Sequence, residues 1–323
     1  MNENTSLSEP IVSLGLPVFN GENYLAQTLD SILAQSFKDF ELIISDNAST
    51  DATQSICENY ARKDDRIRYI RQSKNLGAAA NYDFTFHEAT GELFKWCAHD
   101  DILGHDFLRY CVAHLNEHPE NVGALPQDVR KIDPTGKTLS HVTIDFFSSD
   151  DVSDAKRFAL FVPRSRQIHC APFFALFRRK ALACTNLHGN YLSSDRVLIA
   201  EMLLHGGIAL LKSSDFSFRV HDQQYSQRMS AGQDFCIDWI DPKKSGRRVM
   251  KHCRYVVEFA RSVNRAGLPL RDRMVCYGGV ARLFWSTRRP IAKELLFPFY
   301  RNGNRTKLHT HIRSLVRGFK LRI

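Results

Sequence analysis

Two adjacent carboxylates, Asp100 and Asp101, follow the large apolar residues in the segment FKWCAHDDILGHDFL, residues 94–108. A short apolar run of this kind predicts a buried strand, so both carboxylates would stand where that strand ends. Neighbouring negative charges repel one another and require a cationic partner. A hard divalent cation, Mg²⁺ or Mn²⁺, held by carboxylate oxygens and by the diphosphate of a nucleotide would meet that requirement.

A structural role for the same two carboxylates is the alternative. The segment that follows them, residues 102–115, has the composition of a helix, and Asp100 or Asp101 would then cap its N-terminus. The cation site is favoured by two further polar residues, Asn20 and Asp46, which come at or near the ends of two other apolar runs.

The elements that would position these side chains alternate along the chain. Apolar, β-rich runs predict strands at residues 10–19, 40–46, 67–72 and 92–101. Helical spacing and capping residues predict helices at residues 24–36, 47–60 and 81–90. This alternation predicts an α/β fold with a doubly wound, mostly parallel sheet. Because ligands bind beyond the carboxyl ends of the strands in such sheets, we expect Asn20, Asp46 and Asp100 to line one crevice.

Several classes of protein are disfavoured by the sequence. No G-x-G-x-x-G follows the first predicted strand and no G-x-x-x-x-G-K-[ST] occurs, which argues against a dinucleotide-binding dehydrogenase and a P-loop enzyme. The eight cysteines are scattered without a C-x-x-C pair, so we expect free thiols in a reducing compartment. The N-terminal segment MNENTSLSEP lacks the pattern of a signal peptide, and no apolar run approaches the roughly 18–20 residues that span a bilayer. We therefore expect a cytoplasmic protein.

Several blocks over roughly residues 10–228 resemble the family 2 glycosyltransferases with the GT-A fold. They are LPVFNGENYLAQTLDSILAQSFKDFELIISDNASTDAT, RQSKNLGAAANYDFTFHEATGELFKWCAHDDIL, SSDRVLIAEMLLHGG and FRVHDQQYS. The WCAHDD form and the third block are similar to a bacterial branch associated with cell-surface polysaccharides. The resemblance implies a hexosyltransferase that moves a sugar from a nucleotide-diphosphate donor to a hydroxyl and inverts the anomeric centre.

The resemblance also implies a set of donor-binding residues. They are Pro17, Phe19, Asn20, Glu22, Asp46, Asn75, Gly77, His99 and Asp100. Pro17 and Phe19 would line the pocket for the base, and Asp46 looks like the aspartate that hydrogen-bonds uracil, which favours a UDP-sugar. Asn75 and Gly77 would lie in the loop near the donor.

The implied metal ligands for Mn²⁺ or Mg²⁺ are Asp100, Asp101 and the downstream His221. Arg219, two residues before His221, is a candidate partner for the diphosphate. The chain departs from the commoner Asp-x-Asp-Asp form of the family at Ala98, where the first aspartate would stand. The site therefore has one carboxylate fewer for the ribose or the metal, and His99 is not taken as its replacement.

The residue expected to act as general base is Asp195, in the segment YLSSDRVLIAEMLLHGG. A carboxylate on the acceptor side would remove the proton of the attacking hydroxyl. The same serines and aspartate also form a good N-cap cluster, so Ser193 or Ser194 would cap the helix while Asp195 faces the pocket. Glu201 is expected on the surface of that helix.

Charge divides the chain into two parts. Residues 241–323 hold 21 Lys and Arg against four Asp and Glu, a balance of +17, whereas residues 1–240 hold 23 against 31, a balance of −8. We expect a GT-A domain over 1–240 and a basic helical extension over 241–323. The extension has no nucleic-acid-binding motif, so its basic helices are interpreted either as solvated faces or as attachment to an anionic membrane surface.

The functional hypothesis has alternatives from other classes. A nucleotidyltransferase also uses carboxylates and Mg²⁺, but it would require a glycine-rich, basic loop, which LPVFNGENY does not supply. A non-catalytic nucleotide-sugar or glycan-binding module is the second alternative, and Ala98 favours it slightly. In the leading hypothesis the acceptor is a glycan or a polyprenyl-linked glycan, and the protein is peripheral on the inner face of the cell membrane.

Overall fold

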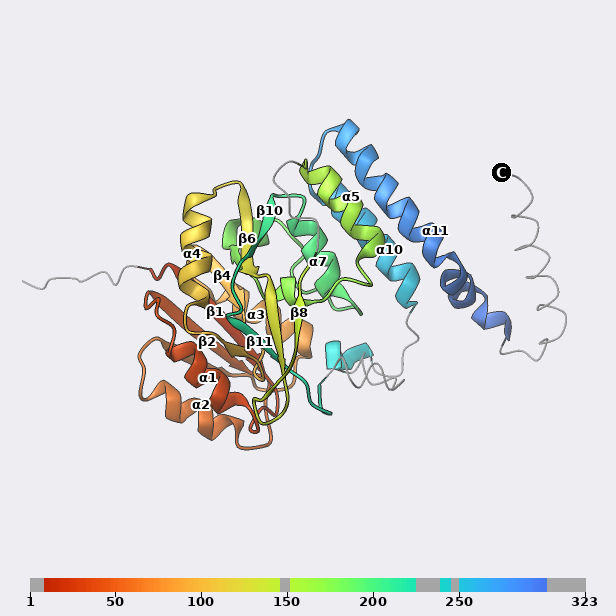
Figure 1. Cartoon of the computed structure of the whole chain (residues 1–323). Helices are drawn as coiled ribbons and strands as arrows, with labels where there is room; N and C mark the ends of the chain where they lie inside the picture. Colours follow the sequence, from red (N-terminus) through yellow and green to blue (C-terminus); the bar gives the residue numbers. More distant parts are fainter. Residues whose placement is uncertain (1–8, 146–151, 225–238, 245–249, 301–323) are drawn as a thin grey trace, which may run out of the picture.

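The computed structural model describes residues 9–145, 152–224, 239–244 and 250–300 (Figure 1). A seven-stranded sheet has the order β10-β6-β9-β4-β1-β2-β3. Its strands are β1 Val12–Val18, β2 Phe40–Asp46, β3 Ile67–Arg71, β4 Leu93–Trp96, β6 Asn121–Pro126, β9 Leu176–Arg178 and β10 Gly207–Leu211. All neighbours pair in parallel except β9, which runs antiparallel to both β4 and β6. The mostly parallel sheet that the sequence predicts is confirmed.

A second, four-stranded sheet brings the two ends of the predicted metal site together. Its order is β5-β11-β7-β8. Its strands are β5 Ile102–Leu103, β7 Asp128–Ile132, β8 Thr138–Thr143 and β11 Phe216–Arg219. Because β5 directly follows the carboxylate pair and β11 directly precedes Val220 and His221, the antiparallel pairing of β5 with β11 joins segments that are far apart in sequence.

Helices cover both faces of the large sheet. The helices that connect its strands are α1 Leu25–Leu33, α2 Thr53–Ala61, α3 Ala78–His87 and α4 Phe107–Glu117. Side chains alternate between faces along β4: Phe94 packs edge-to-face on Phe86 of α3 at 5.3 Å, whereas the Lys95 ammonium lies 4.8 Å from the ring of Phe107 in α4. Helices α3 and α4 therefore lie on opposite faces, as the doubly wound arrangement requires.

Among the predicted boundaries that differ from the structure, three place loops at the ends of the strands. The fourth strand ends at Trp96, so Asp100 and Asp101 lie in a loop rather than on the strand. Helix α2 begins at Thr53 instead of residue 47, and Ala48 in the preceding loop has a left-handed φ of 61°. Helix α4 begins after Asp106, so the alternative interpretation, in which Asp100 or Asp101 caps this helix, is wrong.

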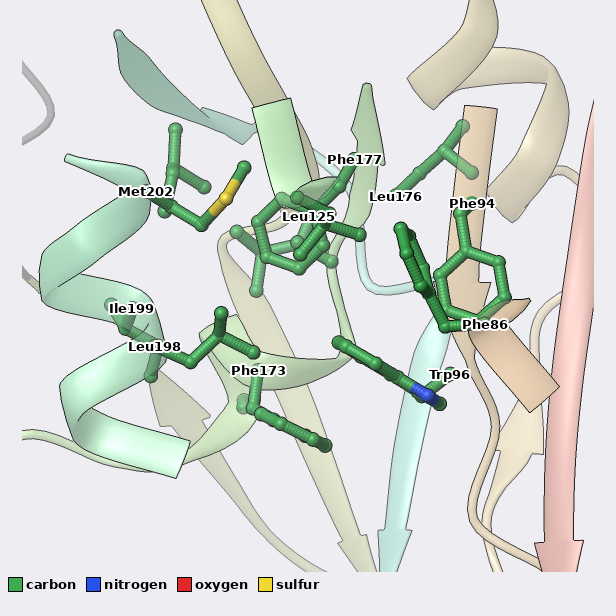
Figure 2. Packing of buried hydrophobic residues seen from close by; sticks show 14 of the residues in the cluster. Phe86, Phe94, Trp96, Leu125, Phe173, Leu176, Phe177, Leu198, Ile199 and Met202 are labelled. Carbon is green, nitrogen blue, oxygen red and sulfur yellow. The ribbon is translucent and has the colours of Figure 1, made fainter. Parts of the chain in front are cut away.

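An aromatic cluster forms part of the hydrophobic core (Figure 2). Trp96 of β4 and Phe173 stack with ring centroids 5.0 Å apart and planes 5° apart. Phe173 belongs to the short helix η1 Ala171–Phe174, and Phe86 of α3 lies against Trp96 at 6.3 Å. Burying such rings contributes strongly to stability, so β4, η1 and α3 are fixed relative to one another.

Four of the remaining helices pack together at one end of the molecule (Figure 1). They are α5 Asp154–Arg164, α7 Ser194–Met202, α10 Lys251–Arg265 and α11 Leu270–Tyr300. Helix α6 Arg179–Ala183 instead packs on β9, and a short helix η2 spans Pro242–Lys244. Among the four, α11 packs on α5 and α10, and α10 packs on α7. A methyl group on Gly279 would lie 2.7 Å from Cα of Ala159, so this glycine allows α11 to approach α5 closely.

The described helices of the basic extension share their core with the rest of the chain. Phe259 and Val263 of α10 are fully buried in the main hydrophobic cluster. Glu201 of α7 is also buried and forms an ion pair with Arg265 of α10, so the expectation that Glu201 lies on the surface is wrong. Residues 245–249 and 301–323 of the expected extension lie outside the described residues, and the division at residue 240 stays a prediction. Among the helices that the structure describes, none combines the length and apolarity needed to cross a membrane.

Candidate active site

The ends of β1 and β2 are interlocked by hydrogen bonds between their loops. The backbone N–H of Asn20 donates to Oγ of Ser49 at 2.9 Å, and the N–H of Thr50 donates back to Oδ1 of Asn20 at 2.9 Å. Glu22 accepts from the N–H of Ala52 at 2.9 Å. The predicted donor-binding residues Asn20 and Glu22 therefore shape a common edge with the loop after β2, and Asn20 has a left-handed φ of 53° to do so.

Asp46, expected to contact the base, is fully buried at the end of β2. Its Oδ1 accepts from the N–H of Ser49 at 2.8 Å, and its Oδ2 accepts from the hydroxyl of Tyr69 at 2.8 Å. Arg71 lies 3.6 Å from the same Oδ2. Asp46 therefore holds the loop in place, and its contact with a base stays a prediction.

Asn75 and Gly77 lie beside this loop, as the sequence predicts. Oδ1 of Asn75 accepts from Nδ2 of Asn47 at 3.0 Å and from the N–H of Gly77 at 2.8 Å. Gly77 has a φ of 86°, and a methyl group there would lie 2.5 Å from the carbonyl oxygen of Ile240. Only glycine tolerates both the backbone conformation and the close approach.

The two residues expected to line the base pocket have different environments. Pro17 lies inside β1, opposite Ser45 of β2, and is buried. Phe19 follows the strand and its side chain is 39% exposed. An exposed aromatic ring at a strand end offers a surface on which a base can stack.

The carboxylate of Asp100 is paired with His221. Nε2 of His221 lies 2.9 Å from Oδ2 of Asp100, and both side chains are almost buried. The ring of His221 also packs against Tyr24, with centroids 4.7 Å apart. The structure thus brings together two of the three predicted metal ligands.

Asp101, the third predicted ligand, is turned toward the backbone of β11. Its Oδ1 accepts from the N–H of Arg219 at 3.0 Å, while its Oδ2 is buried without a hydrogen-bond partner among the described residues. Its role as a metal ligand stays a prediction.

Arg219 fixes the loop that carries both carboxylates. Its guanidinium is fully buried and donates to the carbonyl oxygens of Asp100, Asp133 and Pro134 at 2.8, 3.2 and 2.9 Å. It also donates to Oε1 of Gln27 in α1 at 2.7 Å. With these donors engaged, Arg219 supports the loop from below, and the suggestion that it binds diphosphate does not fit its position.

Burial acts differently on the two neighbouring carboxyl groups. For Asp100, burial opposes ionisation, but the hydrogen bond from His221 and the nearby His99 outweigh it, so the pKa is lowered. For Asp101, burial and the charge of Asp100 raise the pKa well above its ordinary value, against the effect of Arg219. The charge of the pair is thus concentrated on Asp100, beside His221.

These atoms fit a divalent cation. A carboxylate can only accept a hydrogen bond, so Nε2 of His221 donates to Asp100 in this arrangement, and a cation bound between the two groups would take the place of that hydrogen bond. The orphaned Oδ2 of Asp101 is a further oxygen that a cation would satisfy. No cluster of three or more potential ligands stands out in the described part of the chain. Mg²⁺ and Mn²⁺ sites commonly use one or two protein carboxylates and complete the shell with phosphate and water.

Asp195 lies in the first turn of α7 and is half-buried. Its carboxylate has no hydrogen bond or ion pair with any described residue. Ser193, the residue before the helix, is in the left-handed conformation and makes no side-chain capping bond, and Ser194 is already the first residue of the helix, so the cap expected from Ser193 or Ser194 is not formed. Burial and the charge of Asp195 raise the pKa of the Cys170 thiol to about 12, and Asp101 adds to this effect.

Sequence reasoning missed the residues that support this crevice. Thr28 of α1 lies with its hydroxyl 3.0 and 2.8 Å from the carbonyl oxygens of His99 and Asp101. Asn47 accepts from the N–H of Leu76 at 2.7 Å and so ties the end of β2 to the next loop. Asn47 directly follows Asp46 at the end of a predicted strand, and this position could have identified it as a candidate site residue. Thr28 lies in a helix and carries no such signal.

Comparison with known proteins connects this geometry to a family. The family model described as Glycosyl transferase family 2 matches residues 13–185, which is more than half of the chain.

An uncharacterized glycosyltransferase of Rickettsia typhi is 35% identical over 118 residues, which are 36% of this chain and 35% of that protein. Glycosyltransferase GlyA of Streptococcus pneumoniae is 31% identical over 111 residues, 34% of this chain and 16% of that protein. The chain therefore spans well under half the length of these two curated relatives.

A solved structure gives a likeness in fold. The crystal structure of TarS from S. aureus superposes with a TM-score of 0.50 at 17% identity, covering 87% of this chain and 55% of the other. At this level of identity the likeness concerns the fold alone.

Proposed function

Because the chain belongs to glycosyl transferase family 2, we propose that it transfers a sugar from a nucleotide-diphosphate donor to a hydroxyl group, with inversion at the anomeric carbon. One observation carries the proposal: Asp100 and His221 meet 2.9 Å apart beyond the ends of the parallel strands. This is where a doubly wound sheet binds its ligands. A UDP-sugar is the favoured donor, and the acceptor is a glycan or a lipid-linked glycan of a cell-surface polysaccharide.

Asp100 and His221 would hold a divalent cation, with Asp101 and Arg219 supporting the loop. A cation bound there stabilises, as a Lewis acid, the negative charge that develops on the departing diphosphate. The loop from Asn20 to Glu22 and the loop after β2 would orient the nucleotide, with Phe19 beside the base. The fixed hydrogen bonds between these loops pre-organise that half of the site.

Asp195 is proposed to act as the general base. It would accept the proton of the acceptor hydroxyl at a carboxylate oxygen as that hydroxyl attacks the anomeric carbon. Because the carboxylate has no partner in the described structure, no existing hydrogen bond has to be broken first. General-base assistance of this kind typically contributes about 10²–10⁴-fold to the rate.

A purified sample of the full chain tests the reaction. We expect slow release of nucleoside diphosphate from one member of a panel of UDP-, GDP- and dTDP-sugars in the presence of Mn²⁺. The release should stop with EDTA and in Asp100→Ala, while the exposed-site control Asp65→Ala should retain it. Equal release by the wild type and Asp100→Ala would contradict the proposed site.

We also propose that the protein attaches to the inner face of the membrane through α11, which lies along the outer edge of the four packed helices (Figure 1). Met274, Trp285 and Leu295 of this helix are 65%, 53% and 54% exposed. The exposed basic residues of the same helix are Arg271, Arg282, Arg288, Arg289 and Lys293. Apolar side chains flanked by cations suit an anionic lipid surface, where each basic residue contributes about 1 kcal/mol.

Flotation with vesicles tests the attachment. The chain should float with vesicles that contain anionic phosphatidylglycerol and should not float with vesicles of neutral phosphatidylcholine. Trp285→Ser should weaken flotation, whereas Leu139→Ser, at an exposed position of β8, should not. Equal recovery on both kinds of vesicle would remove this proposal.

A further inference from the structure

Tyr82 of α3 stands between the two halves of the crevice with its ring held on three sides. It stacks on His188 with centroids 5.0 Å apart and planes 30° apart. Phe173 lies at 5.7 Å and Trp96 at 6.3 Å, both tilted relative to the tyrosine ring. Packing from three different segments leaves the ring little freedom, so the position of its hydroxyl is fixed.

The hydroxyl of Tyr82 has no hydrogen-bond partner among the residues that the structure describes, and the residue as a whole is half-buried. By contrast, the hydroxyls of Tyr69 and Tyr255 donate to Asp46 and Ser165 at 2.8 Å each. A polar group held rigidly without a protein partner is available to a ligand, because making that hydrogen bond requires little further loss of side-chain freedom.

Neighbouring segments connect the stacked pair to both parts of the proposed active site. Trp96, which lies against the Tyr82 ring at 6.3 Å, ends the strand that leads into the Asp100 loop. On the other side of the stack, Nδ1 of His188 lies 3.3 Å from Oγ of Ser194, the residue directly before Asp195. Burial and the charges of Asp100 and Asp101 raise the pKa of Tyr82, so its hydroxyl keeps its proton and can donate.

The segment that carries His188 is fixed by its own contacts and has a strained backbone. The N–H of His188 donates to Oδ1 of Asp83 at 2.8 Å, and its Nδ1 lies 3.3 Å from Oγ of Ser194. Leu187 and Ser193, on either side, have left-handed φ values of 47° and 64°. Non-glycine residues in this region are strained and concentrate at functional sites.

We propose that the hydroxyl of Tyr82 hydrogen-bonds the transferred sugar of the nucleotide-sugar donor and contributes to the choice of that sugar. The inference rests on the proposed function. In an inverting displacement the acceptor attacks opposite the leaving phosphate, so the sugar lies between the phosphate site at Asp100 and the base Asp195. A site that hydrogen-bonds a substrate hydroxyl discriminates against sugars that lack it, because its own polar group is then left unpaired.

Tyr82→Phe isolates the hydroxyl because it keeps the ring and its three contacts. Tyr60→Phe is the matched control, since it removes a surface hydroxyl that bonds Asp30 at 2.6 Å. With Mn²⁺ present, the affinities for the best nucleotide sugar of the panel and for its nucleoside diphosphate alone are measured by calorimetry for both variants and the wild type.

We expect Tyr82→Phe to bind the nucleoside diphosphate as the wild type does and to bind the nucleotide sugar about 2- to 12-fold more weakly, the range of an ordinary neutral hydrogen bond. Its melting temperature without ligand should be unchanged, which separates a binding role from a structural one. The inference is overturned, with the proposed function intact, if both affinities are unchanged or if only the acceptor KM rises. Absence of nucleotide binding by the wild type would overturn both.

Discussion

Nε2 of His221 lies 2.9 Å from Oδ2 of Asp100, although 121 residues separate them in the chain. The contact depends on the pairing of β5 with β11, which places the segment after one strand beside the segment before the other. Without this histidine, the two carboxylates could serve only to anchor the loop. With it, they form a candidate cation site. The predictions below test this contact, its support and the groups around it.

His221→Ala should weaken the use of metal. Removing one of the two paired ligands should raise the Mn²⁺ concentration that gives half-maximal activity by about 10- to 100-fold. The measurement is a metal titration of donor hydrolysis. His141→Ala, which removes an exposed histidine of β8, serves as the control. An unchanged titration in His221→Ala would exclude the histidine from the cation site.

Arg219→Met should destabilise the fold. It removes the buried guanidinium that donates to the carbonyl oxygens of Asp100, Asp133 and Pro134, and it removes one of the positive charges that favour ionised Asp101. Loss of one partner from such a buried network costs about 3–5 kcal/mol of unfolding free energy. Urea denaturation of this variant and of the exposed-site variant Arg288→Met measures the difference. If both variants lose equally little stability, Arg219 does not support the loop.

Asp195→Asn should lower kcat and leave donor binding unchanged. The amide has almost the same shape but cannot accept a proton, so transfer should slow by about 10²–10⁴-fold. The affinity for the nucleotide sugar, measured separately, should match that of the wild type. A full rate in Asp195→Asn would assign the base to another residue.

Asp83→Asn should change how stability depends on pH. Burial raises the pKa of Asp83 to about 7, because the N–H of His188 compensates it only in part. The folded chain therefore holds this proton up to about pH 7, while the unfolded chain releases it near pH 4. The unfolding free energy of the wild type thus falls as the pH rises between these values.

In Asp83→Asn the side-chain oxygen can still accept from His188, and no charge forms at high pH. The variant should therefore gain stability relative to the wild type on going from pH 5 to pH 8, by on the order of 1–2 kcal/mol after allowing for partial solvent exposure. Denaturation at both pH values measures this gain. If the difference in unfolding free energy between the variant and the wild type is the same at pH 5 and pH 8, Asp83 does not form a buried charge at the higher pH.

The local sequence pattern was sufficient to predict the strands and helices that carry the site. The apolar run that ends at Asp46 predicts β2 with the boundaries that the structure has, since a strand buried on both faces reads as a continuous apolar segment. The spacing of Leu25, Leu29 and Ile32 likewise predicts the buried face of α1. Because parallel strands direct their carboxyl ends to one edge, the approximate location of the crevice followed from these elements alone.

Tertiary structure decided which polar groups meet there. Nothing near Asp101 in the sequence indicates that it accepts a hydrogen bond from the N–H of Arg219. The local sequence pattern places Glu201 on the surface, but in the folded chain it binds Arg265, which is 64 residues later and in another helix. Tyr82 is similar, because its three aromatic neighbours come from β4, η1 and the segment before α7. Periodicity records which face of an element is apolar, whereas the partner of a buried charge or hydroxyl is set by packing between distant segments.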